Sequence, residues 1–171
     1  FYNVIRMMKD RLGANAVPIQ LPIGKEADFI GMVDLIAMKA EVYYDNDGKD
    51  VREEEIPADM LSQAEEYRAA MLDAVAEEDD EVLERYLNGE EISREEILRC
   101  IRKGTIANRI VPVCCGTSYR NKGVQPLLNA IVDFMPSPLD VPAPVGTDKS
   151  GEKHIETVCA DDAPFAALAF K

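Results

Sequence analysis

The chain has 171 residues, enough to bury a hydrophobic core, and its length fits one domain or one domain and part of a second. Its 32 acidic and 19 basic residues give a formal net charge of −13, which disfavours contacts with nucleic-acid phosphates and favours a basic partner. No apolar run approaches the ~20 residues of a membrane span, so we expect no membrane contact. The four cysteines lack CxxC spacing and disulfide-framework density, which is typical of reduced thiols in a cytoplasmic protein.

The N-terminal segment has the periodicity of a helix followed by a strand. Apolar residues of 1–12 form one helical stripe, and Gly13 stands where a left-handed residue ends a helix. Apolar side chains of 17–23 then alternate with Pro18, Gln20 and Pro22. This pattern predicts a strand at the edge or end of a sheet, because proline cannot donate to a central ladder.

A β-hairpin is predicted next. Its first strand alternates between two faces, one with Met38, Ala40, Val42 and Tyr44 and the other with Lys39, Glu41 and Tyr43. Turn residues at 45–48 precede a polar run at 51–56, so the second strand has a solvated edge. The aspartates of the turn do not form a calcium loop, since the glycine comes too early and Ile56 stands where a bidentate Glu is required.

Helical periodicity follows the hairpin. Pro57, at a first helical turn, opens a long amphipathic stretch that runs to about Asn88. Ser93 and Glu96 have the spacing of a capping box, so another helix is expected from there to about Gly104.

An acidic stripe lies in the first of these helices. It consists of Asp73, Glu77, Asp80, Glu81 and Glu84. The spacing i, i+4, i+7, i+8 and i+11 puts all five on one face if the helix is continuous. A solvated face is the ordinary explanation of such a run.

Residues 110–135 predict a buried strand, a glycine-bounded polar loop at 116–123 and an amphipathic helix. The helix carries its apolar residues at Val124, Leu127, Leu128, Ile131 and Val132. Ligands bind outside the carboxyl ends of strands in open parallel sheets, so the loop is the expected site, acting chiefly through backbone amides. The adjacent Cys114 and Cys115 are expected to be packing residues that point to opposite faces.

After Met135 the composition changes. Prolines at 136–144 favour extended backbone and mark a domain boundary. Two short strands are expected at 152–159 and 165–170, around a turn at 161–164. His154 has no evident nucleophile or acid beside it and is interpreted as a surface residue.

The stretches at 115–125 and 136–142 resemble the end of the GTPase domain of bacterial elongation factor G, the ribosomal translocase; residues 17–24, 31–35 and 164–171 extend the likeness. The resemblance implies an α/β fold, α+β overall. It combines a partial P-loop GTPase core, an inserted subdomain of antiparallel sheet and helices, and the first strands of a β-barrel domain. The implied parts are core segment 1–24, insertion 25–109, last core strand and helix 110–135, linker 136–150 and second domain from 151 to 171. The helix and strand at 1–23 are expected to pack beside the strand and helix at 110–135, with the insertion folded as a separate lobe.

The same resemblance implies a guanine-binding loop at Gly116, Thr117, Ser118 and Tyr119, with a backbone amide near Ser118 donating to the O6 atom of the base. The family's usual Gly-Ser-Ala-Phe is replaced here, which leaves the backbone role intact. Asn121-Lys122 is not the guanine-reading Asn-Lys-x-Asp, because Val124 occupies the Asp position. From the residues alone, a plain strand-to-helix turn is the favoured explanation of the loop, because such loops are common in α/β units.

No GxxxxGK[ST] sequence occurs, so the loop that holds phosphates and magnesium is missing. We therefore expect a piece of a longer protein, whose parent binds GTP, GDP and Mg²⁺ and hydrolyses GTP. The piece alone would have no catalytic residues, metal or tightly bound nucleotide.

The resemblance implies the ribosome as partner, with the acidic stripe matching a helix implicated in contact with the basic face of the ribosomal stalk protein. No sequence-specific nucleic-acid contact is expected. Other ribosomal GTPases remain alternatives, namely a tetracycline-resistance ribosomal protection protein or a peptide-chain release factor of the GTPase class. A non-enzymatic acidic adaptor is an alternative of another class.

Overall fold

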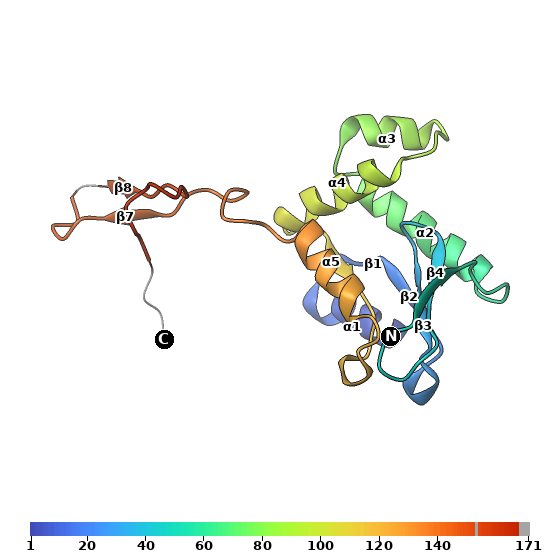
Figure 1. Ribbon diagram of the computed structural model, residues 1–171. Coiled ribbons are helices and arrows are strands. Elements are labelled where there is room, and N and C mark those ends of the chain that lie inside the picture. The colour runs from blue at the N-terminus through green and yellow to red at the C-terminus, as the bar shows by residue number, and fades with distance from the viewer. Residues whose placement is uncertain (153, 168–171) are drawn as a thin grey trace. The chain divides into compact units, whose positions relative to one another are not determined.

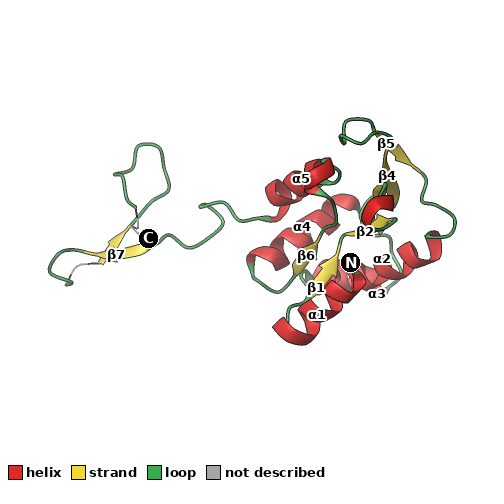
Figure 2. Cartoon of the chain, turned by 90° about the horizontal axis from the view of Figure 1, so that it is seen from below, coloured by secondary structure: helices red, strands yellow, loops and turns green. Residues whose placement is uncertain are grey.

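The computed structural model describes residues 1–152 and 154–167. The chain divides after Met135 into two compact units (Figure 1). Helices and strands are intermixed in the first unit (Figure 2), so the architecture is mixed α/β, as the sequence predicted. The proline-rich segment begins at the first residue of the second unit.

Helix α1 (Tyr2–Leu12) ends as predicted at Gly13, whose φ of 60° is left-handed. The amide of Gly13 donates to the Lys9 carbonyl at 3.1 Å, which satisfies one carbonyl of the last turn. A residue with a side chain would be strained at this φ, so glycine fixes where the helix stops.

The single strand predicted at 17–23 is two strands in different sheets. β1 (Ala16–Pro18) pairs in parallel with β6 (Val111–Val113), and β2 (Gln20–Ile23) joins an antiparallel sheet. Ile19 is the crossing point, since its amide donates to the Val113 carbonyl at 3.1 Å and its carbonyl accepts from the Leu35 amide at 3.0 Å. The expected pairing of the N-terminal strand with the strand after Ile110 is confirmed.

The antiparallel sheet has the order β2-β3-β4-β5, with β3 (Gly31–Asp34), β4 (Lys39–Tyr43) and β5 (Val51–Glu54) following in sequence. The predicted hairpin is confirmed as β4 and β5. All residues of β5 are exposed, which agrees with a solvated edge. A short 3₁₀ turn, η1 (Glu26–Asp28), lies between β2 and β3.

The long helix predicted after Pro57 is two helices. α2 (Leu61–Ala76) begins four residues after this proline, and α3 (Asp80–Leu87) is separate from it. The break occurs because Asp79 adopts an extended conformation and its carboxylate accepts from the amides of the first turn of α3. The capping box predicted at Ser93 is confirmed at the start of α4 (Arg94–Ile106).

The main hydrophobic core combines residues of 25–109 with residues of 1–24 and 110–135, so the prediction of a separate lobe for residues 25–109 is wrong. The reason is that α2 packs on β1 and α4 packs on β6, which joins the inserted helices directly to the parallel strands. Core residues from both regions are Val17, Leu21, Val33, Met71, Val75, Ile97, Ile101, Ile110 and Phe134.

Helix α5 (Val124–Phe134) is present as predicted, but most of its apolar stripe is uncovered. Four of these side chains are 45–77% exposed, namely Leu127, Leu128, Ile131 and Val132. β6 was expected to be buried, yet Val111 is exposed. Among the described residues, this parallel sheet consists of β1 and β6 alone, so the outer edge of each strand, including that of β6, has no partner strand. Parallel sheets are ordinarily covered on both faces.

In the second unit, β7 (Val145–Thr147) pairs antiparallel with β8 (His154–Glu156). β8 lies within a predicted strand, whereas β7 falls in the segment expected to be linker. The strand predicted at 165–170 is not formed at 165–167, and its remaining residues lie outside the described part of the chain. His154 is exposed, as expected.

Candidate functional site

The loop at 116–123, here called the candidate base-binding loop, connects β6 to α5 and is closed by its own backbone. Thr117 and Lys122 exchange backbone hydrogen bonds of 2.8 and 3.1 Å. Between them a single 3₁₀ turn, η2 (Ser118–Arg120), ends at Asn121, whose φ of 51° is left-handed. The loop therefore lies at the carboxyl end of a parallel strand, where α/β proteins bind ligands.

Glycine is required at both ends of this loop. A Cβ atom on Gly116 would lie 2.8 Å from the Lys122 carbonyl oxygen, and one on Gly123 would lie 2.7 Å from that of Cys115. Gly123 also has a φ of +84°. Because both contacts are with backbone, a larger residue would force the two ends of the loop apart.

A hollow of about 240 Å³ lies beside the loop. Three of the predicted residues line it, namely Gly116, Thr117 and Ser118. Tyr119 does not line it and is 98% exposed. The geometry thus brings three of the four predicted residues to one concave surface and directs the fourth to solvent.

A larger hollow of about 990 Å³ is lined only by residues of the second unit. Its walls are extended, proline-rich backbone with exposed apolar side chains such as Phe165 and Val158. Asp161 is the one charged side chain among its lining residues. Ligand sites need several convergent polar groups, so size alone does not make this hollow the site.

The sequence interpretation missed contacts between the antiparallel sheet and the candidate base-binding loop. The Gln20 side chain accepts from the Cys115 amide at 3.2 Å, and the Tyr43 hydroxyl accepts from the Gly123 amide at 2.9 Å. Strand alternation grouped Tyr43 with Lys39 and Glu41, which pointed to a polar face. The sequence does carry a signal for the left-handed backbone at Asn121, because asparagine is favoured at positive φ in turns.

The two adjacent thiols flank the hollow and are unreactive in character. Cys114 packs against the main core and Cys115 against a second cluster around Tyr43, which agrees with opposite faces. Burial raises the pKa of Cys114 to about 11 and that of Cys115 to about 12. Both remain protonated near neutral pH, so neither is a candidate nucleophile.

The acidic residues are all exposed, but they do not form one helical stripe. Asp73 lies on α2, Glu77 ends that helix, and Asp80, Glu81 and Glu84 lie on α3. The continuous stripe predicted from spacing is therefore wrong, because the chain turns at Asp79. The structure instead divides the acidic residues between the end of α2 and α3, and Asp80, Glu81 and Glu84 are here called the acidic group on α3. Asp73 is partly engaged, since its carboxylate accepts from the Tyr86 hydroxyl at 2.7 Å.

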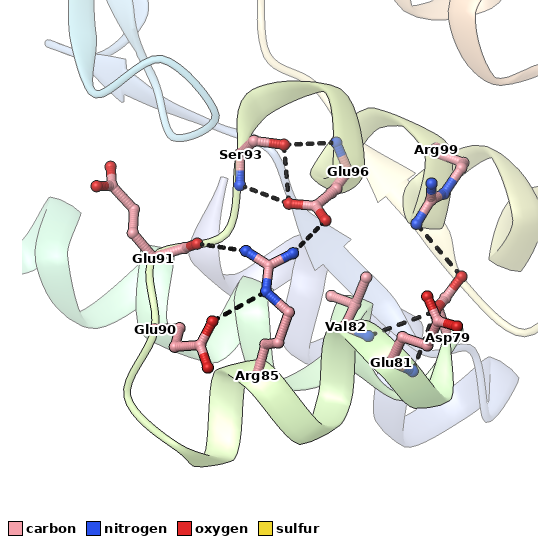
Figure 3. Close-up of polar contacts among 9 residues, drawn as sticks. All are labelled: Asp79, Glu81, Val82, Arg85, Glu90, Glu91, Ser93, Glu96 and Arg99. Carbon is pink, nitrogen blue, oxygen red and sulfur yellow. Dashed lines mark hydrogen bonds and ion pairs between the residues drawn. The ribbon is translucent and has the colours of Figure 1, made fainter.

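Two arginines hold α3 against α4 (Figure 3). Arg85 donates to the carboxylates of Glu90 and Glu96 and to the Glu91 carbonyl. Arg99 forms an ion pair with Asp79 at 3.4 Å. These contacts fix the direction in which α3 presents its carboxylates.

No group of three His, Cys, Asp or Glu side chains that could hold a metal ion occurs among the described residues. In the same residues, no helix is both long enough and apolar enough to cross a membrane.

The first unit is thus a mixed α/β unit with a loop after a parallel strand, at the position where α/β proteins bind ligands. No family model matches the chain. The crystal structure of ttk003000868 from Thermus thermophilus is similar to it, with a TM-score of 0.69 and 30% sequence identity. The similarity covers 80% of this chain and 20% of that one, so this chain spans about a fifth of the length of that protein.

Proposed function

We propose that this chain is part of a translational GTPase of the elongation factor G type, whose parent couples GTP hydrolysis to movement of tRNA and mRNA through the ribosome in the cytoplasm. The observation that carries the proposal is the candidate base-binding loop, closed by Thr117 and Lys122 at the carboxyl end of β6. In the proposal this loop binds the guanine base.

The loop fits a base better than a phosphate. Its hollow is lined by Gly116, Thr117, Ser118 and mostly apolar neighbours, with Lys122 as the one charged residue, and a flat ring can lie against such a surface. The first amides of a 3₁₀ turn have no partner within that turn, so the Ser118 amide is a suitable donor to a carbonyl such as guanine O6. Tyr119, exposed to solvent, would have no direct role.

The phosphates and Mg²⁺ of GTP would be held outside this chain. No phosphate-binding glycine loop occurs in the sequence. The uncovered apolar face of α5 and the unpaired edge of β6 provide a surface where further strands of a GTPase core would pack. The greater length of the similar Thermus thermophilus protein is consistent with such an arrangement.

The acidic group on α3 supports a basic partner. Asp80, Glu81 and Glu84 are exposed on one short helix that Arg85 and Arg99 hold in place. An ordered acidic surface steers a basic protein such as the ribosomal stalk protein, which we propose as its partner. A solvated face without a partner is the competing explanation.

The test uses the longer protein that contains this chain. Titration with a fluorescent GDP analogue should give saturable binding at micromolar concentration or tighter, and an adenine analogue should bind far more weakly. The isolated 171-residue chain should show no saturable binding in the same range. A parent that prefers adenine, or binds no nucleotide, would refute the proposal and favour the acidic adaptor.

A further inference from the structure

The turn between β4 and β5, residues 44–50, lies against the candidate base-binding loop (Figure 1). Asn121 and Asp47, which join the two segments, are 74 positions apart in sequence. The loop is closed by its own hydrogen bonds, but those bonds do not fix its orientation on the molecule. The contacts that do so come from the antiparallel sheet.

The first contact is made by Tyr43 at the end of β4. Its side chain is buried, 4% exposed, and its hydroxyl accepts from the Gly123 amide at 2.9 Å. Gly123 is the N-cap residue of α5, where the loop passes into the helix. An amide left without an acceptor in this buried place is unfavourable, so the hydroxyl holds the end of the loop.

The second contact is made by the turn between β4 and β5. The Asn121 side chain donates to the Asp47 carbonyl at 3.2 Å. A Cβ atom on Gly48 would lie 2.1 Å from the Asn121 carbonyl oxygen, so only glycine allows this approach. The turn is itself rigid, because the Asp45 carboxylate accepts from the amides of Lys49 and Asp50 at 3.0–3.1 Å.

A third contact comes from the turn η1. Arg120 of the loop donates to the Ala27 carbonyl at 3.0 Å. The Cys115 amide also bonds to Gln20 of β2. The loop is thus held at its start, its tip and its end by the antiparallel sheet and the turns that connect its strands.

We propose that the antiparallel sheet positions the candidate base-binding loop through Tyr43, Gly48 and Asn121, so that the inserted sheet and the guanine base are energetically coupled. This inference rests on the proposed function for the role of the base. Coupling between two sites is reciprocal. A bound base should therefore stabilise the β4–β5 turn, and a change in the turn should alter discrimination among bases.

Hydrogen exchange of the 171-residue chain tests the positioning without any nucleotide. Tyr43→Phe removes the acceptor of the Gly123 amide, and exchange across 116–123 should become about fivefold faster, as expected for one lost hydrogen bond. Tyr44→Phe is the matched control, since Tyr44 neighbours it but is 55% exposed and bonds to Glu54. Exchange across the loop that is equal in both variants would overturn the inference.

Two further pairs separate positioning from backbone strain. Gly48→Ala is compared with Gly89→Ala, because both glycines have positive φ but Gly89 has open space around its Cβ position. Asn121→Ala is compared with Asn108→Ala, because both asparagines are left-handed. Only the first member of each pair should speed hydrogen exchange across 116–123. If Gly48→Ala fails to fold, the Tyr43 and Asn121 variants decide whether the sheet positions the loop.

The longer protein tests the coupling. Tyr43→Phe should reduce the ratio of GDP to ADP affinity about fivefold, whereas Tyr44→Phe should leave it unchanged. GDP should also slow exchange in residues 44–50. Faster exchange across the loop with an unchanged ratio of GDP to ADP affinity would support the positioning of the loop by the sheet but refute the guanine role proposed for the loop. An unchanged loop with normal GDP binding would refute the positioning alone.

Discussion

Arg109, in the turn after α4, donates from Nε to both carboxylate oxygens of Glu78, at 3.1 and 3.0 Å. Glu78 lies where α2 gives way to α3, and its side chain is buried while that of Arg109 is largely exposed. The pair fixes the break between the two helices against the end of α4. A buried carboxylate depends on such a partner, because it has lost most of its hydration.

The two partners should therefore respond differently to substitution. Arg109→Ala leaves a buried charge unpaired and should lower the free energy of unfolding by about 3 kcal/mol. Glu78→Gln leaves Arg109 in solvent and should lower it by about 1 kcal/mol. Urea unfolding measures both. Lys49→Ala, which removes the exposed ion pair with Asp47, is the control and should change stability by less than ~0.5 kcal/mol. Equal losses for the two partners would contradict this account.

The acidic group on α3 should control the rate of association with a basic partner. The triple variant Asp80→Lys, Glu81→Lys, Glu84→Lys should slow binding of the parent to ribosomes about tenfold at low salt, with the difference shrinking as salt is raised. Stopped-flow mixing measures the rate. Asp73→Asn should slow association less than Glu84→Gln, because the Asp73 carboxylate already accepts a hydrogen bond from the Tyr86 hydroxyl.

A matched control for this triple variant changes the same amount of charge elsewhere. Glu53→Lys, Glu54→Lys, Glu55→Lys lies on and beside the exposed strand β5. It should leave the rate nearly unchanged. If both triple variants slow binding equally, net charge rather than the α3 surface is responsible.

The capping box of α4 should make stability depend on acidic pH. Hydrogen bonds from the Ser93 backbone and hydroxyl, with a contribution from Arg85, lower the pKa of Glu96. A carboxyl with a lowered folded pKa stabilises the protein above its unfolded pKa of about 4.3, and that contribution is lost as pH falls. The stability difference between wild type and Glu96→Gln should thus be full at about pH 6 and disappear toward about pH 3. Glu95→Gln, its exposed neighbour, should show no such trend in urea unfolding.

The partly buried thiols of Cys114 and Cys115 should make stability depend on alkaline pH. Because the folded pKa values of Cys114 and Cys115 lie above the unfolded value of about 8.5, their contribution is full below that pH and falls as pH rises. Between about pH 9 and 10 the slope should be about 1.4 kcal/mol per pH unit for each thiol. Cys114→Ala and Cys115→Ala should each reduce that slope, whereas Cys159→Ser, at an exposed position, should not.

Thiol labelling gives an independent check on the same residues. At about pH 8, a disulfide reagent should react quickly with the exposed Cys159 and slowly with Cys100, Cys114 and Cys115 until urea is added. Rapid labelling of Cys115 in the folded chain would show that its thiol is accessible and would contradict the raised pKa.

Local signals in the sequence determined the elements whose causes lie within a few residues. Gly13 ended α1, Ser93 and Glu96 capped α4, and the turn at 45–48 joined β4 to β5, each where predicted. Capping, left-handed glycine and turn chemistry act over three or four residues, so the sequence carries them directly. The position of the loop after β6 was predictable for the same reason.

Tertiary structure decided everything that depends on distant partners. Spacing could not reveal that Glu78, at the break between α2 and α3, bonds to Arg109, 31 positions away. Nor could it reveal that residues 17–23 divide between two sheets at Ile19, or that Tyr43 faces inward to bond with Gly123. Periodicity records which side of an element is apolar, but burial is set by what packs against that side. The sequence predicts that α5 has an apolar face. Only the fold determines that this face is exposed.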